Sequence, residues 1–97
     1  MPLNPQSAGT QMMVPARNLI GNADSLKSDT VDLAVGGVKI VAKAIRIGTT
    51  GGDLIVDSVG GSTNQTIPNV QVGETVVGQF TRIRASTACA GMTVYYD

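Results

Sequence analysis

The chain of 97 residues contains no histidine, and its one cysteine is Cys89. Without an imidazole, neither a Ser-His-Asp triad nor a Cys-His nucleophile can be assembled, and most zinc sites lack a usual ligand. A lone cysteine also excludes a disulfide within the chain. Cys89 lies between small residues in a predicted turn, so we interpret it as a structural or incidental thiol.

Charge is also scarce, because charged residues make up 14% of the chain and the formal net charge is zero. Soluble domains average about 25%, so we expect a subunit of an assembly, with a small secreted domain as the alternative. The chain has no basic excess, and Phe80 and two tyrosines are too few for a stacking platform, so we expect no nucleic-acid partner. No apolar run approaches the roughly 20 residues of a membrane span, and the N-terminus does not resemble a signal peptide, so we expect no membrane partner.

Strong helix formers are few, since Glu74 is the only glutamate and leucine is outnumbered by valine, isoleucine and threonine. β-Branched residues fit a pleated surface, and the 12 glycines supply turns. Turn signals recur at roughly ten-residue spacing, as in small sandwiches and barrels. The sequence therefore predicts an all-β fold, a small antiparallel β-sandwich or barrel with an extended N-terminal arm.

Residues 1–29 form the predicted arm and residues 30–97 the predicted β-domain. The arm contains three prolines and no sustained period of two, which disfavours regular structure. It is too apolar for an ordinary disordered tail, so we expect it to pack on a neighbouring subunit; a floppy terminus is the alternative. The apolar residues predicted to contact the partner are Met12, Met13, Val14, Leu19 and Ile20.

The β-domain begins with two predicted strands, "TVDLAV" and "VKIVAKAIRI", separated by the turn signal Gly36-Gly37. Strict alternation in the second places Lys43 and Ile45 on one face and Ala42 and Ala44 on the other. A helix fits the same pattern, but β-branched content favours a strand. Later segments predict a short strand that Pro68 ends or edges, and a strand with Gly78 inside it, which suggests a bulge or a close backbone approach.

The glycine-rich "GTTGGD", residues 48–53, allows two interpretations, a phosphate-binding loop or the turn of a β-hairpin. A P-loop requires a lysine and a helix after its glycines, whereas Gly52 is followed by Asp53 and a β-branched run. We therefore predict a hairpin turn that binds no nucleotide.

Charged side chains offer few sites for chemistry. Asp53 and Asp57 would lie about 13 Å apart along a strand, too far for a paired acid and base. Asp24, Asp29 and Asp32 lack the order of a calcium loop, and we expect all of these carboxylates to be solvated at the surface. Hence the sequence predicts no catalytic site, no metal site and no cofactor.

Two arginines in "TRIRAS", Arg82 and Arg84, lie side by side on one strand face. They are candidates for binding an anionic surface or a carboxylate of a neighbouring subunit. A partly solvated edge face is the alternative.

Three segments together resemble the head-spike base proteins of tailed phages and gene transfer agents. They are "AKAIRIGTTGGDLIV", "GGSTNQTIPNVQVGETV" and "VVGQFTRIRASTACAGMTVYYD", preceded by "NADSLKSDTVDL". The resemblance covers about residues 24–97. The family has more arginine in the penultimate strand, and the segment before Asn22 has no counterpart in it.

The resemblance implies a virion structural protein on the outer capsid surface, a decoration or head-spike base subunit that is not an enzyme. It would bind the major capsid protein, stabilise the shell or mount a spike or fibre protein, and form a homo-oligomer. Alternatives are a tail component or a carbohydrate-binding adhesion module. The missing tryptophan argues against the latter, because sugar platforms use flat rings.

Overall fold

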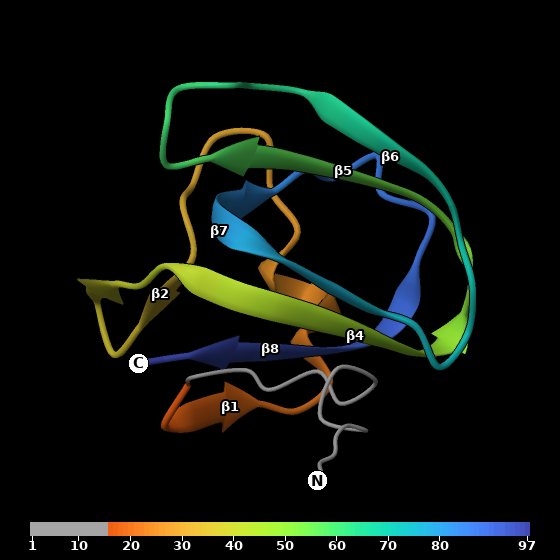
Figure 1. The fold of residues 1–97 in the computed structure, drawn as a ribbon. Coiled ribbons are helices and arrows are strands. Elements are labelled where there is room, and N and C mark those ends of the chain that lie inside the picture. Colours follow the sequence, from red (N-terminus) through yellow and green to blue (C-terminus); the bar gives the residue numbers. More distant parts are fainter. Residues whose placement is uncertain (1–15) are drawn as a thin grey trace, which may run out of the picture.

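The computed structural model describes residues 16–97 and is almost entirely β (Figure 1), which confirms the predicted fold class. Its elements are β1 (Asn18–Ile20), the 3-10 helix η1 (Ala23–Leu26), β2 (Ala34–Val35), β3 (Val38–Lys39), β4 (Ala42–Thr50), β5 (Gly52–Ser58), β6 (Gln65–Val70), β7 (Thr75–Ile83) and β8 (Ala90–Tyr96). No helix in residues 16–97 is long and apolar enough to cross a membrane.

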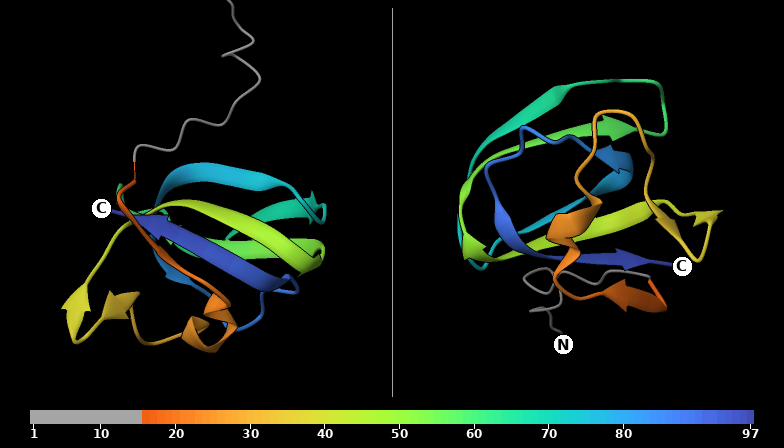
Figure 2. Two further views of the ribbon diagram at one scale, coloured as in Figure 1. Left: turned by 90° about the horizontal axis from the view of Figure 1, so that it is seen from below. Right: turned by 180° about the vertical axis from the view of Figure 1, so that it is seen from behind.

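Six strands form one antiparallel sheet in the order β1-β8-β4-β7-β5-β6. The sheet curls around its core, so that β5 and β6 lie across from β4 and β8 with β7 between them (Figures 1 and 2). Its edge strands β1 and β6 do not pair with each other in the described chain, so the barrel is open. Strand β6 continues past Pro68 and lies at the edge of the sheet, where the missing N–H breaks no ladder, so the edge alternative is confirmed.

The predicted hairpin at residues 48–53 is wrong. Strands β4 and β5 are not neighbours, because β7 lies between them and pairs with both. The glycines instead form a corner at which the chain bends from one side of the curled sheet to the other. A Cβ on Gly51 would lie 2.4 Å from the Val70 carbonyl oxygen, and Gly52 has φ 145° beside Ala88. The corner therefore needs glycine for close packing as well as for backbone conformation.

Strand β4 departs from the predicted alternation. Ala42, Ala44, Ile45 and Ile47 are all buried, although Ala44 and Ile45 are adjacent. The pairing of β4 with both neighbours shifts register between Ala42 and Ala44, which marks a β-bulge. A bulge inserts one residue and changes which side chains face inward. Hence Ile45 joins the core instead of sharing the outer face with Lys43.

The core fills the concave side of the sheet. Its largest fully buried side chains are Leu33, Ile45, Ile47, Leu54, Ile83, Met92, Val94 and Cys89. Phe80 closes one part of the core by folding back over Gly78, where a Cβ would lie 2.5 Å from the ring. The close backbone approach predicted at Gly78 is therefore wrong, because the nearest group is the Phe80 ring. The alternative, a bulge, is confirmed, since β7 has one residue more than β4 between Val77 and Phe80.

The segment before β4 lies against this sheet. Strand β1 pairs with β8, and Ala23 of η1 is completely buried in the core. Within the predicted strand 30–35, only Ala34–Val35 is a strand, and it pairs with Val38–Lys39 across the predicted Gly36-Gly37 turn. Leu33 is instead tied to the sheet, since its N–H donates to the Thr81 carbonyl oxygen at 2.9 Å.

Candidate interaction surface

The residues predicted to contact a partner fall in three places. Met12, Met13 and Val14 lie outside the described residues. Leu19, in the edge strand β1, is 59% exposed, whereas Ile20 packs against the core. Leu19 is therefore the apolar residue of this group that faces solvent within the described chain.

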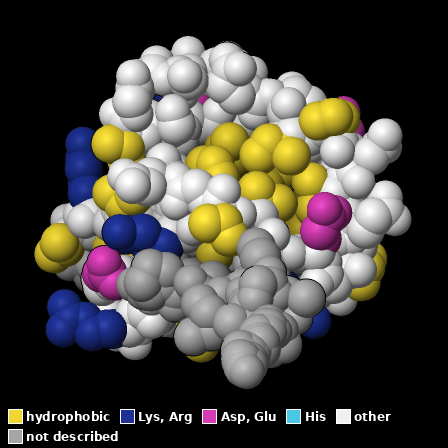
Figure 3. Space-filling view, viewed as in Figure 1, with side chains coloured by type: hydrophobic (Ala, Val, Ile, Leu, Met, Phe, Trp, Pro, Cys, Tyr) yellow, Lys and Arg dark blue, Asp and Glu magenta, His cyan; other side chains and the backbone are white. Residues whose placement is uncertain are grey.

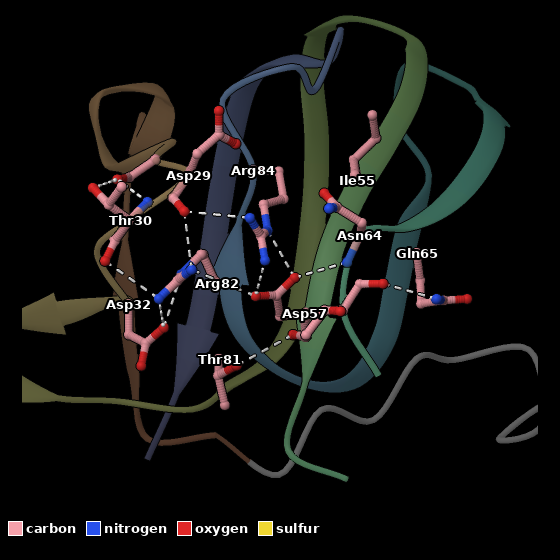
Figure 4. Close-up of polar contacts among 12 residues, drawn as sticks. Asp29, Thr30, Asp32, Ile55, Asp57, Asn64, Gln65, Thr81, Arg82 and Arg84 are labelled. Atoms are coloured by element: carbon pink, nitrogen blue, oxygen red, sulfur yellow. Dashed lines mark hydrogen bonds and ion pairs between the residues drawn. The ribbon is translucent and has the colours of Figure 1, made fainter. Parts of the chain in front are cut away.

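Arg84 is held by Asp57 in a bidentate ion pair (Figure 4). Its Nε donates to Asp57 Oδ1 and its Nη2 to Oδ2, each at 2.8 Å. Asp57 is buried and also accepts the backbone N–H of Asn64 at 3.0 Å. The bond from Arg84 holds the pKa of the Asp57 carboxyl below its ordinary value, and Asp57 in turn raises the pKa of Arg84. The expectation that Asp57 is solvated at the surface is wrong.

Arg82 extends the same cluster to the segment before β2. Its Nε donates to Asp32 Oδ1 at 2.9 Å, and its Nη1 donates to the Asp29 carbonyl oxygen at 3.1 Å. Figure 4 shows both arginines pointing into the space between this segment and β5. We call Arg82, Arg84, Asp32 and Asp57 the arginine cluster. Because these donors are occupied within the chain, a carboxylate of another subunit would have to displace Asp32 or Asp57.

A second carboxylate, Asp24, fastens the same segment at another point. Its Oδ2 accepts the N–H of Gly91 at 2.9 Å, and its Oδ1 accepts the N–H of Met92 at 3.1 Å. These bonds hold the pKa of Asp24 below its ordinary value, the bond from Gly91 contributing most. Sequence reasoning missed both contacts, because 67 and 68 residues separate the partners and no local pattern marks them.

Cys89 is fully buried beside the glycine corner, where its thiol donates to the Gly52 carbonyl oxygen at 3.4 Å. Burial raises the pKa of this thiol, which disfavours the nucleophilic thiolate. Within residues 16–97, no group of three or more histidine, cysteine or acidic residues is placed to hold a metal ion.

An apolar groove lies beside the β2–β3 hairpin, where the start of β4, the end of β8, the middle of β7 and the residue after β5 also line it. It encloses about 570 Å³ and is lined by Val35, Val38, Lys39, Ile40, Val41, Lys43, Val59, Gln79, Tyr96 and Asp97. We call it the hairpin groove. Val38 is 68% and Val59 is 51% exposed, so large apolar side chains of this groove face solvent.

No family model, curated protein or solved structure matches this chain. The resemblance of residues 24–97 to head-spike base proteins stays a prediction from the sequence. The hairpin groove and the exposed edge residue Leu19 are the candidate contact surfaces within the described chain.

Proposed function

We propose that this protein is a virion structural protein, a capsid decoration or head-spike base subunit. In this role it binds the major capsid protein on the outer surface of the particle. It either stabilises the shell or mounts a spike or fibre protein. Its activity is binding, and its contact surfaces are apolar.

One observation carries the proposal. Charged side chains are engaged in contacts within the chain, whereas large hydrophobic side chains lie on the surface. Charged groups of the arginine cluster hold the fold, while seven large hydrophobic side chains within residues 16–97 lie exposed. They are Leu19, Val31, Val35, Val38, Val59, Val72 and Val77. Figure 3 shows hydrophobic side chains gathered near the middle of one face, with charged side chains scattered around them. A chain with so few free surface charges is suited to being covered by other subunits.

The resemblance of about residues 24–97 to head-spike base proteins supports a position on the outer capsid surface. The open barrel is consistent with a small β-domain that is mounted on a larger surface. Edge strands such as β1 offer backbone groups to which a neighbour can add a strand.

The test is quantitative mass spectrometry of purified particles from the host that carries the gene, combined with immunogold labelling. We expect several copies per particle and label on the outside of the head. Label confined to tails would replace the decoration role by that of a tail component. Absence from particles, together with binding to a glycan array, would overturn the proposal in favour of an adhesion module.

A further inference from the structure

We infer that the hairpin groove is a contact between two copies of this chain. The inference deepens the proposed function and rests on it for the existence of an assembly. It assigns the groove, rather than the arginine cluster, as the surface through which the subunits meet. The argument depends on the shape of the hairpin, its apolar residues and the charges at the rim.

The β2–β3 hairpin stands away from the sheet (Figure 2, left). It has two residues in each strand, and Val35 pairs directly with Val38 across it. A two-stranded ribbon is marginally stable in water when nothing covers it. Both valines are nevertheless exposed, 39% and 68% respectively, and each lines the groove. Covering them would stabilise the hairpin and remove apolar surface from water.

The groove has further apolar lining residues, with Val59 after β5 and Ile40 and Val41 between β3 and β4. Val59 is about half exposed. An apolar centre surrounded by charged side chains is the usual arrangement of a protein–protein contact. The hairpin of one copy is therefore a suitable apolar element for the groove of another.

The rim charges favour a second copy over a charged partner. Lys39 Nζ lies 3.5 Å from Asp32 Oδ2, and Lys43 Nζ lies 3.5 Å from Asp97 Oδ2, so charges of both signs lie at the rim. A rim that carries both signs is not specialised for nucleic acid or for a strongly acidic or basic protein. It complements itself, because a two-fold axis can place Lys39 of one copy opposite Asp97 of the other. The exposed fractions, 81% for Lys39 and 48% for Asp97, leave both side chains free to exchange partners.

The test measures the mass of the full chain in solution by sedimentation over a range of concentrations. We expect at least a dimer, and Val38→Asp and Val59→Asp should each weaken association about ten-fold or more. Val72→Asp is the matched control, because Val72 is 56% exposed but does not line the groove. Lys39→Glu should weaken association, and adding Asp97→Lys should restore it. Circular dichroism checks that every variant is folded.

Three outcomes would overturn the inference: a monomer at all concentrations, association that survives both groove variants, or equal weakening by Val72→Asp. Loss of folding in Val38→Asp would leave the Lys39–Asp97 charge exchange as the deciding measurement. Groove-dependent association of a protein that is absent from particles would overturn the proposed function alone. A particle protein whose isolated chain is monomeric would overturn this inference alone.

Discussion

The arginine cluster and the hairpin groove differ in where they place charged and apolar side chains. In the arginine cluster, Asp57 is 6% exposed and is satisfied by Arg84 and a backbone N–H. In the hairpin groove, Val38 is 68% exposed and faces solvent. In the arginine cluster, charged residues stabilise the fold. In the hairpin groove, apolar residues face solvent.

This contrast separates what each region contributes. Contacts of the arginine cluster join β5, β7 and the segment before β2, which lie far apart in sequence. Removing one residue of the arginine cluster leaves the charge of its partner uncompensated. The expected effect is therefore a lower free energy of unfolding. Val38 and Val59 of the groove are more than half exposed, so we expect substitutions of these two residues to act mainly on association. Substitutions in the two regions therefore test the contrast directly.

The largest effect is expected for Asp57→Ala. It leaves the Arg84 guanidinium, whose side chain is 14% exposed, without its bidentate partner. Removing one partner of a largely buried ion pair leaves the other charge uncompensated, so this variant should lose more stability than any other in this set. Urea unfolding followed by circular dichroism measures the loss. The control is Asp53→Ala on the same strand, where an exposed carboxylate accepts one backbone N–H at 3.2 Å. Equal losses for the two variants would contradict the structural role given to Asp57.

The glycine corner connects the two regions, because it joins β4, which contributes to the groove, to β5, which carries Asp57. We expect Gly52→Ala to destabilise by about 2 to 3 kcal/mol, since φ is 145° and the new Cβ would meet Ala88 at 2.9 Å. Gly60→Ala in the β5–β6 turn is the control, with no atom within 4 Å of its Cβ. Chemical denaturation measures the free energy of unfolding of both variants. If Gly52→Ala leaves this free energy unchanged, the corner can relax to accept the new Cβ.

Much of the fold was predictable, because strand content, turn spacing and the edge position of Pro68 depend on local composition. The choice of strand neighbours was not. Two apolar runs joined by glycines have the same sequence pattern whether they pair with each other or, as here, each with β7. The bulge at Ala42–Ala44 was hidden for a similar reason, since tertiary burial of Ile45 overrides strict alternation.

The candidate site was less predictable than the fold. Arg82 and Arg84 were recognised as a pair on one face, but their partners are separated from them by 27 to 55 residues in the chain. No spacing rule connects such residues. The exposure of Val38 and Val59 depends on the position of the β2–β3 hairpin relative to the six-stranded sheet. Sequence periodicity does not predict this position.

A smaller effect is expected from acid. Asp57 and Asp24 both have a pKa below the ordinary 3.8, owing to Arg84 and to the N–H of Gly91 respectively. Their stabilisation is fully present above the unfolded-state value and is lost as the pH falls through the folded-state values. Arg82 and Lys27 add to the positive surroundings of these two carboxylates. Protonation leaves a neutral carboxyl that still fills its site, so the loss should be smaller than in Asp57→Ala. Melting temperatures between pH 6 and pH 2 should fall mainly below about pH 4, and an Asp24→Asn variant should fall less steeply.

The smallest effect on stability is expected in the groove. Val38→Ser and Val59→Ser should change the free energy of unfolding by about 0.5 kcal/mol or less, because each side chain is at least half exposed in the subunit. The measurement must be made at a concentration where the chain is monomeric, since association adds apparent stability. At higher concentration the same variants should lower the melting temperature relative to the wild-type chain. A large loss in the monomer would show that the hairpin supports the core, and the division between a stabilising cluster and a contact groove would then fail.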